Sequence, residues 1–195
     1  MDKVLLLDID KTIIDTDSMM LFVLYSIKYS KINILRIPLV LVATLLYHLH
    51  LMPIEVTKSI VYKPINTMSK DDINYFMDNI VMKHKNEILF NIIKKYQKLN
   101  YKIIMVTASI ETYMIYFKEQ GYADELFGTR YDTKVIGKNC KHAEKVERLK
   151  TLQLDIDFEN SYAYSDSLTD LPMLNLVKNR FQVIYKDKKA VLKKL

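Results

Sequence analysis

The chain has 195 residues, of which 50% are hydrophobic and 27% charged, a balance that excludes an intrinsically disordered protein and allows one sizeable core with a small inserted domain. Its single cysteine, Cys140, excludes an internal disulfide and is compatible with a reducing compartment. The formal net charge of +6 favours anionic partners, but no basic stripe interleaved with aromatic residues is present, so we expect no nucleic-acid partner.

The first predicted element is a buried strand, Val4–Asp8, because four apolar residues run directly into an aspartate. The apolar run is too short for a signal peptide and is interrupted by Asp8 and Asp10. We therefore expect a cytoplasmic protein, located at the inner face of the membrane if any segment binds lipid.

Residues 19–82 follow as helices without a clear strand, punctuated by Pro53 and Pro64. A segment of this length is better explained as a helical cap than as a loop. The predicted domains are therefore a core of residues 1–18 and 83–195 and a cap of residues 19–82.

Within the cap, the uncharged run Ile37–Ile54 lies at the lower edge of the length that crosses a bilayer. Three interpretations compete: a buried cap helix, a helix in a membrane interface, and a true span. A span inside an α/β chain would separate the first strand from its sheet, so we disfavour it. The other two interpretations stay open, and peripheral membrane contact through residues 37–54 is one of them.

Strands and helices alternate in the rest of the chain. Predicted strands are Lys102–Thr107, Ser161–Asp166 and Phe181–Tyr185, and helical patterns at Ile88–Leu99 and His142–Leu152 precede the first two of these. This alternation predicts an α/β fold with a parallel sheet and helices on its faces. The basic tail Lys186–Leu195 is interpreted as a solvated terminal helix, with contact to a membrane surface as the alternative.

Polar residues follow these strands at the points where they end. Asp8 and Asp10 are two residues apart, so they point to the same side if the segment is extended. Thr107 ends the second strand, and Asp166 and Asp170 follow the third. Because the carboxyl ends of adjacent parallel strands meet at one rim, we expect these side chains to lie together.

Lys145, on the helix before the third strand, can reach the same rim, and Ser109 follows Thr107 closely. Clustered carboxylates suit Mg²⁺, which takes one or two carboxylates and accepts a phosphate oxygen. With the metal and a lysine neutralising the phosphate, an aspartate can attack phosphorus. Thr107 would donate to a phosphoryl oxygen, and Lys145 would offset charge in the transition state.

The motif order D-x-D-x-T, hhT, K and D-x(3)-D resembles the haloacid dehalogenase-like phosphohydrolase superfamily over nearly the whole chain. The resemblance implies a Rossmann-like parallel sheet core with a helical cap inserted after the first strand. It also implies a phosphatase that forms an aspartyl-phosphate on Asp8, with Asp10 as the general acid and base. Lys11 departs from the pattern, since many members have glycine there.

The resemblance further implies binding roles for the remaining motif residues. Thr107 and Lys145 match phosphate-binding positions. Asp8, the backbone carbonyl of Asp10, and Asp166 match the ligands of Mg²⁺. Asp170 matches a supporting position beside them.

Within the superfamily, the chain resembles the phosphoserine-phosphatase-like subgroup through Asn139–Leu149 and Asp166–Leu174. It also resembles the phosphatidylglycerophosphatase C type, through its apolar cap run and the stretch LPMLNLVKNRFQVI. A phosphoserine enzyme is expected to hold the substrate carboxylate with a cap arginine, for which Arg36 is the candidate. Asp17 falls where that subgroup places an acidic residue for the amine. The balance favours a lipid or amphiphilic phosphomonoester such as phosphatidylglycerophosphate over phosphoserine.

Two other classes are weighed against an enzyme. A receiver-type phosphoacceptor module also uses aspartates, Mg²⁺, a threonine and a lysine, but it lacks a large cap and a D-x(3)-D motif after the lysine. A membrane-binding scaffold would not need the complete motif set. Cys140 is interpreted as a packed thiol, since no histidine partner is indicated.

Overall fold

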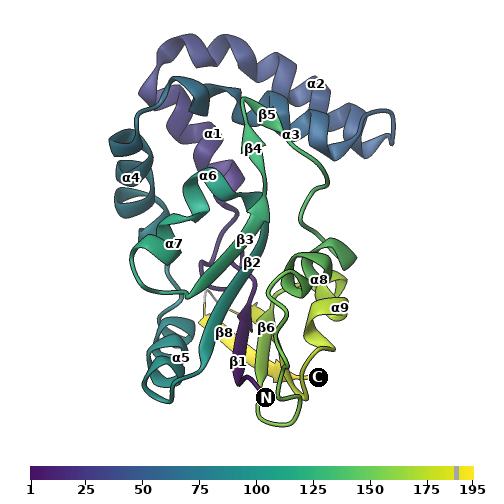
Figure 1. The fold of residues 1–195 in the computed structure, drawn as a ribbon. Helices are drawn as coiled ribbons and strands as arrows, with labels where there is room; N and C mark the ends of the chain where they lie inside the picture. The colour runs from purple at the N-terminus through teal and green to yellow at the C-terminus, as the bar shows by residue number, and fades with distance from the viewer. Residues whose placement is uncertain (187–188) are drawn as a thin grey trace.

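A computed structural model of the chain describes residues 1–186 and 189–195 (Figure 1). Its centre is a six-stranded sheet of order β3-β2-β1-β6-β7-β8, parallel except for the last pair. The strands are β1 (Val4–Leu7), β2 (Lys102–Ile110), β3 (Glu125–Thr129), β6 (Tyr162–Ser165), β7 (Asn179–Lys186) and β8 (Lys189–Lys194). Helices flank the sheet, so the predicted α/β fold with a Rossmann-like core is confirmed.

Strand β1 lies at the centre of the sheet, and all four of its residues are fully buried. Alternate side chains point to opposite faces. Leu5 and Leu7 join the hydrophobic cluster that contains residues of helix α5 (Glu87–Lys98). Val4 and Leu6 join the cluster that contains residues of α8 (Ala143–Lys150) and α9 (Leu171–Leu174). Both faces of β1 are therefore covered, and the position of its carboxyl end is fixed by packing.

The four predicted strands correspond to β1, β2, β6 and β7, and the two predicted helices to α5 and α8. Edge strand β3 was not predicted from the sequence. It follows two short helices, α6 (Glu111–Met114) and α7 (Tyr116–Glu119), and its segment ELFGT lacks a clear alternation. Strand pairing with β2 stabilises it there.

The predicted terminal helix is wrong. Lys189–Lys194 forms strand β8, which pairs antiparallel with β7, while residues 187 and 188 of the tail lie outside the described residues. Ala190 and Leu192, two residues apart, pack against the core, while Lys189, Val191 and Lys193 alternate with them, a period of two that suits a strand. The charged tail therefore covers the sheet edge, and its lysines oppose further strand pairing.

Residues between β1 and α5 form helices, as predicted. They are α1 (Ser18–Tyr29), η1 (Lys31–Arg36), α2 (Ile37–His48), α3 (Ile54–Tyr62), η2 (Lys63–Thr67), α4 (Lys70–Asn79) and η3 (Val81–His84). The chain enters and leaves this region side by side, because Ile14 bridges to Lys85 and the Ile13 carbonyl accepts a hydrogen bond from the Asn86 N–H. The cap limits at residues 19 and 82 stay a prediction.

An aromatic cluster joins the cap to the core. Phe22, Tyr62 and Phe76 of the cap pack on Tyr113 of α6, with ring centroids 5.4–6.0 Å apart. The short hairpin of β4 (Tyr131–Asp132) and β5 (Lys134–Val135) also reaches the cap, where the Val135 N–H donates to Ser59 Oγ of α3. Aromatic packing of this kind holds the cap over the carboxyl ends of the strands.

Helix α2 lies across the outside of the cap (Figure 1). Of its residues only Ala43 is buried. The interpretation of the Ile37–Ile54 run as a buried cap helix is therefore wrong for α2.

Candidate active site

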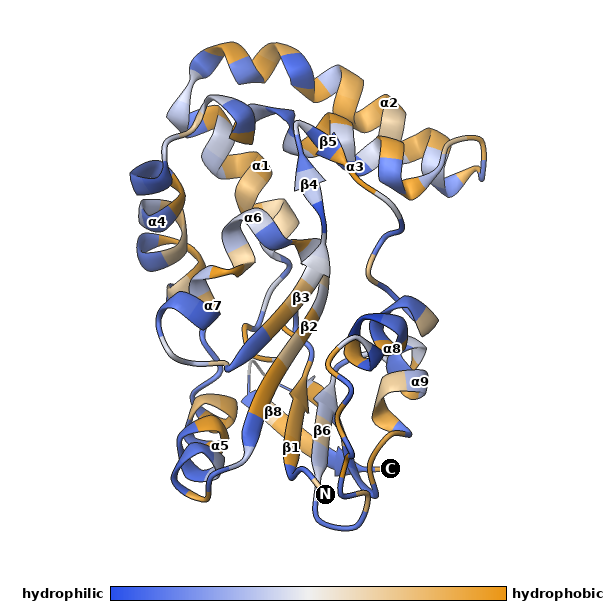
Figure 2. Ribbon diagram, in the orientation of Figure 1, coloured by the Kyte–Doolittle hydropathy of each residue, from blue (hydrophilic) through white to orange (hydrophobic). Residues whose placement is uncertain are grey.

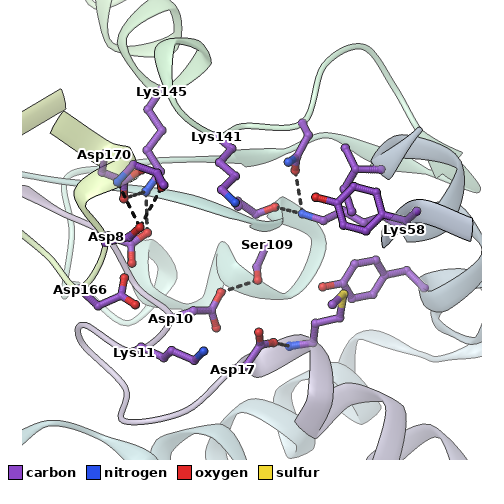
Figure 3. A pocket seen from close by; sticks show the side chains of 18 residues that line it. Asp8, Asp10, Lys11, Asp17, Lys58, Ser109, Lys141, Lys145, Asp166 and Asp170 are labelled. Carbon is purple, nitrogen blue, oxygen red and sulfur yellow. Dashed lines mark hydrogen bonds and ion pairs between the residues drawn. The ribbon is translucent and has the colours of Figure 1, made fainter. Parts of the chain in front are cut away.

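A pocket of about 280 Å³ lies between the carboxyl ends of the strands and the cap (Figure 3). Five aspartates reach it from two separate segments of the sequence: Asp8, Asp10 and Asp17 follow β1, and Asp166 and Asp170 follow β6. Four lysines also line it: Lys11, Lys58, Lys141 and Lys145. The predicted carboxylates thus come together, and cations accompany them.

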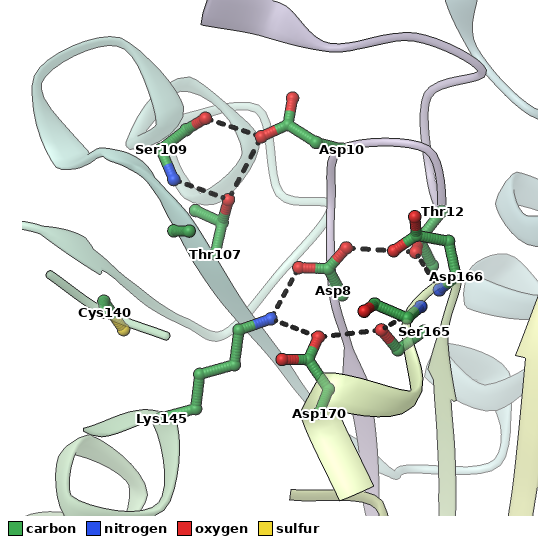
Figure 4. A network of polar contacts seen from close by, with 12 residues as sticks. Asp8, Asp10, Thr12, Thr107, Ser109, Cys140, Lys145, Ser165, Asp166 and Asp170 are labelled. Atoms are coloured by element: carbon green, nitrogen blue, oxygen red, sulfur yellow. Dashed lines mark hydrogen bonds and ion pairs between the residues drawn. The ribbon is translucent and has the colours of Figure 1, made fainter. Parts of the chain in front are cut away.

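The Lys145 ammonium is held between two carboxylates (Figure 4). Its Nζ donates to Asp8 Oδ1 at 2.6 Å and to Asp170 Oδ2 at 2.7 Å, and all three side chains are buried. Burial alone would lower the pKa of Lys145, but the two carboxylates raise it well above its usual value. Lys145 is therefore a permanent cation beside Asp8.

Two hydroxyl groups complete this cluster. Thr12 Oγ1 donates to Asp8 Oδ2 at 3.0 Å, and Ser165 Oγ donates to Asp170 Oδ2 at 2.7 Å. Burial raises the pKa of the Asp8 carboxyl to about 7, against the lowering effect of Lys145. A second cation beside Asp8 would therefore favour its ionised form, in which a carboxylate is nucleophilic.

Asp10 faces the same pocket with different partners. Its Oδ1 accepts from the Ser18 N–H at 2.7 Å, and its Oδ2 accepts from Ser109 Oγ at 2.5 Å. Burial raises the pKa of its carboxyl, while these hydrogen bonds lower it. Strand β1 ends at Leu7, so both aspartates lie in the segment beyond it, and a turn with Lys11 at φ 56° follows Asp10. A carboxyl group of raised pKa is suited to proton transfer.

Asp166 offers a carboxylate to the pocket. Its backbone N–H donates to Thr12 Oγ1 and its carbonyl accepts from Gln182. Within residues 1–186 and 189–195, no hydrogen bond to its carboxylate is present, and Figure 3 shows this group beside Asp8. The carboxylate is thus available for a further ligand.

The donor set fits Mg²⁺. Across the described part of the chain, no three His, Cys, Asp or Glu side chains group as a metal site. The expected set needs only two carboxylates, Asp8 and Asp166, together with the Asp10 backbone carbonyl. Mg²⁺ prefers few protein oxygens and keeps waters or substrate oxygens in its other positions.

Three predicted residues lie less directly at the pocket. Thr107 is fully buried behind Asp10, 3.5 Å from its Oδ2, and accepts from the Ser109 N–H. Asp17 lines the pocket but also caps α1, accepting from the Met19 N–H at 2.9 Å. Arg36 is not brought to the site, because its guanidinium donates to the Ile60 carbonyl and it does not line the pocket.

Lys58 of α3 is a pocket residue that sequence reasoning missed. Its side chain is only 6% exposed, and its Nζ donates to the Ala108 carbonyl and to Asn139 Oδ1. Burial lowers the pKa of Lys58 to about 8. The signal was present in the sequence: Lys58 shares the buried face of an amphipathic helix with Val61 and Tyr62, where a lysine needs polar partners.

Several solved structures share this architecture. A protein of unknown function from Bordetella pertussis Tohama I is 17% identical, with a TM-score of 0.73 over 92% of this chain and 88% of its own. A probable phosphoserine phosphatase from Vibrio cholerae, in unliganded form, is 15% identical, with a TM-score of 0.71 over 92% of this chain and 55% of its own. A phosphoserine phosphatase described as a phospho-aspartyl intermediate analogue is 17% identical, with a TM-score of 0.60 over 92% and 85%.

At these identities the likeness shows the fold alone. No curated protein matches the chain. The family match rests on the sequence itself: residues 5–175, which include every motif from Asp8 to Asp170, match the haloacid dehalogenase-like hydrolases. The chain belongs to the haloacid dehalogenase-like hydrolase family.

Proposed function

We propose that the protein is a Mg²⁺-dependent phosphomonoester hydrolase that works through an aspartyl-phosphate on Asp8. The observation that carries this proposal is the buried Lys145 ammonium held 2.6 Å from Asp8 at the floor of a lysine-lined pocket. A carboxylate in this setting is oriented and charge-compensated for attack on an anionic phosphate. The structural likeness to a phosphoserine phosphatase in a phospho-aspartyl form supports the same scheme.

Asp8, Asp166 and the Asp10 backbone carbonyl would hold the metal. When bound, Mg²⁺ supplies Lewis-acid polarisation of a phosphoryl oxygen and neutralises part of its charge. The chain's own cation, Lys145, acts on the other side of Asp8 and remains protonated across the neutral range.

Asp8 then forms a bond from a carboxylate oxygen to phosphorus while the bond to the leaving oxygen breaks. Asp10 gives its proton to that oxygen and later takes one from the water that cleaves the aspartyl-phosphate. Thr107 is assigned a hydrogen bond to a phosphoryl oxygen, although its hydroxyl lies behind Asp10 in this structure. Lys58 provides a cation from the cap side of the pocket for the substrate's anionic groups.

The substrate we favour is a lipid or amphiphilic phosphomonoester such as phosphatidylglycerophosphate. Met19, Tyr47 and Ile54 of the cap give the pocket an apolar wall, and Arg36 does not reach it to clamp a carboxylate. Phosphoserine or another small soluble phosphomonoester is the alternative. Two observations favour it: Asp17 lines the pocket, and the buried cation of Lys58 could hold a carboxylate.

The function is tested by phosphate release from phosphatidylglycerophosphate in mixed micelles and from phosphoserine, each with Mg²⁺ and with a chelator. We expect turnover only with Mg²⁺ and a higher kcat/KM for the lipid. A preference for phosphoserine would contradict the lipid assignment, and turnover that persists in the chelator would contradict the metal assignment.

The Asp8→Asn variant tests the nucleophile. We expect kcat to fall at least about a thousandfold, because an amide cannot form the phosphoenzyme. Lys145 keeps its ion pair with Asp170 in this variant, so the fold is expected to persist, as circular dichroism would check. Asp71→Asn, at an exposed position of α4, is the control. Near-normal turnover by Asp8→Asn would overturn the assignment.

The Asp10→Asn variant tests the acid and base. Its kcat should fall about a hundredfold or more, since proton transfer contributes that much to such steps. Breakdown of the aspartyl-phosphate should be slowed, so that base-labile phosphate stays on the quenched protein longer than on the wild type. Absence of protein-bound phosphate in both proteins would refute the two-step scheme.

Lys58 is expected to act in substrate binding. Lys58→Met should raise KM about tenfold with little change in kcat, because the lost attraction is felt by substrate and transition state alike. The pKa of about 8 adds a pH dependence. The ammonium is charged below that pH and neutral above it, so the wild-type KM should rise as the pH passes 8.

Lys58→Arg should remove this rise, since arginine stays charged. Lys63→Met, at an exposed position of the same cap, is the matched control and should leave KM unchanged. A KM that is insensitive to both pH and Lys58→Met would exclude Lys58 from substrate binding.

A further inference from the structure

The outer surface of the cap is strongly apolar. Helix η1, α2 and the turn after α2 expose large hydrophobic side chains, and Figure 2 colours much of the α2 ribbon orange for hydrophobic residues. Those that are more than half exposed, between 51% and 78%, include Leu35, Leu39, Leu41, Val42, Leu45 and Leu51. We call these six residues the α2 patch. A contiguous apolar surface of this kind on a soluble domain indicates a binding surface.

The segment that carries the α2 patch has charges of one sign. Between Asp17 and Glu55 the sequence contains no acidic residue. Lys28 and Lys31 are exposed beside the start of the patch. A segment that combines exposed apolar side chains with lysines is complementary to anionic lipid, because the head groups attract the lysines while the acyl region takes up the leucines.

The segment that carries the α2 patch also reaches the catalytic pocket. Tyr47, near the end of α2, and Ile54, at the start of α3, both line that pocket. At about 280 Å³ the pocket can take a phosphate and its head group but not two acyl chains. A lipid substrate would therefore keep its chains outside the pocket, on the side where the apolar surface lies.

We propose that the α2 patch docks the protein on an anionic membrane surface, with η1 and α2 lying in the plane of the interface and the pocket mouth turned toward the lipid head groups. The inference rests on the proposed phosphomonoesterase function, since it names the bilayer as the source of the substrate.

Residues Lys31–His48 are long and apolar enough to cross a bilayer, and almost none of this stretch is buried. Two contacts favour the in-plane arrangement. Ala43 is buried against the cap, and its carbonyl lies 3.5 Å from Thr57 Oγ1 of α3. Tyr47 contributes to the pocket wall. A spanning helix would withdraw both residues from the folded cap, whereas an interfacial helix keeps them in place.

The test is flotation of the purified full chain with vesicles of phosphatidylcholine alone and of phosphatidylcholine with phosphatidylglycerol, at low and high salt. We expect the protein to bind the anionic vesicles and to bind the neutral ones more weakly. High salt should weaken binding to the anionic vesicles, because it screens the attraction between the lysines and the lipid head groups. The double variant L41Q/L45Q should bind about tenfold or more weakly, because two exposed leucines no longer enter the interface.

I88Q/L99Q is the matched control, since both residues are comparably exposed but belong to the core, Ile88 on α5 and Leu99 at its C-cap. It should bind to the vesicles as well as the wild type does.

The proposal is overturned if the wild type floats with neither kind of vesicle, or if L41Q/L45Q binds as well as the wild type. It is also overturned if light scattering shows a dimer that L41Q/L45Q converts to a monomer, because a second copy would then cover the patch. If Lys31–His48 is protected from protease added on either side of sealed vesicles, the segment crosses the bilayer, and the docking proposal is overturned.

Turnover of a water-soluble phosphomonoester, such as p-nitrophenyl phosphate, separates this proposal from the proposed function. L41Q/L45Q should retain that turnover while it loses vesicle binding. If the protein binds vesicles but shows no turnover, the docking proposal stands and the phosphatase proposal is refuted. If it shows turnover but binds no vesicles, the phosphatase proposal stands and the docking proposal is refuted.

Discussion

The site depends on one buried cation. Lys145 reaches from α8 between two carboxylates that follow different strands, Asp8 after β1 and Asp170 after β6. Loss of one partner from such a buried pair costs about 3–5 kcal/mol, because the remaining charge is left without compensation. The three groups can meet only because β1 and β6 are adjacent in the sheet and α8 packs on the face that Val4 and Leu6 present. The order of the strands and the packing of α8 therefore both determine whether the three charged groups of the site can meet.

Two carboxylates around one ammonium leave an excess of negative charge. This excess suits a further cation, and a cation bound there would in turn attract a phosphate rather than a neutral ligand. The Asp10 carboxylate makes no ion pair with Lys145, although Asp10 is only two residues from Asp8 in the sequence. The turn at Lys11, which follows Asp10, folds the chain back so that the Ser18 N–H reaches the Asp10 carboxylate, and Ser109 of the neighbouring strand β2 reaches it as well. The same residue type thus acquires two environments, one dominated by a fixed cation and one by neutral donors, as a nucleophile and a proton carrier require.

Much of this arrangement could be predicted from the sequence, because the short polar motifs stand directly after hydrophobic strands, and the α/β alternation places the carboxyl ends of these strands at one edge of a parallel sheet. What could not be predicted depended on tertiary contacts. Strand β8 was mistaken for a helix because a lysine-rich tail gives a weak pattern until β7 supplies its partner. Lys58 was missed although its position on the buried face of α3 marks it, because its partners, Ala108 and Asn139, are distant in the sequence. Arg36, assigned by residue type alone, turns to the Ile60 carbonyl.

Helix α3 connects the chemistry to the surface of the molecule. On one side it presents Lys58 to the pocket, where the ammonium reaches the carbonyl of Ala108 just beyond β2 residue Thr107. On another side it packs against α2, whose exposed face carries the apolar patch. Any force that orients α2 on a surface therefore also orients the pocket wall that α3 forms. A head group that enters from that surface would meet Lys58 before it reaches Asp8 and Lys145. The cap would then select substrates by their charge, while the buried cluster would perform the phosphoryl transfer.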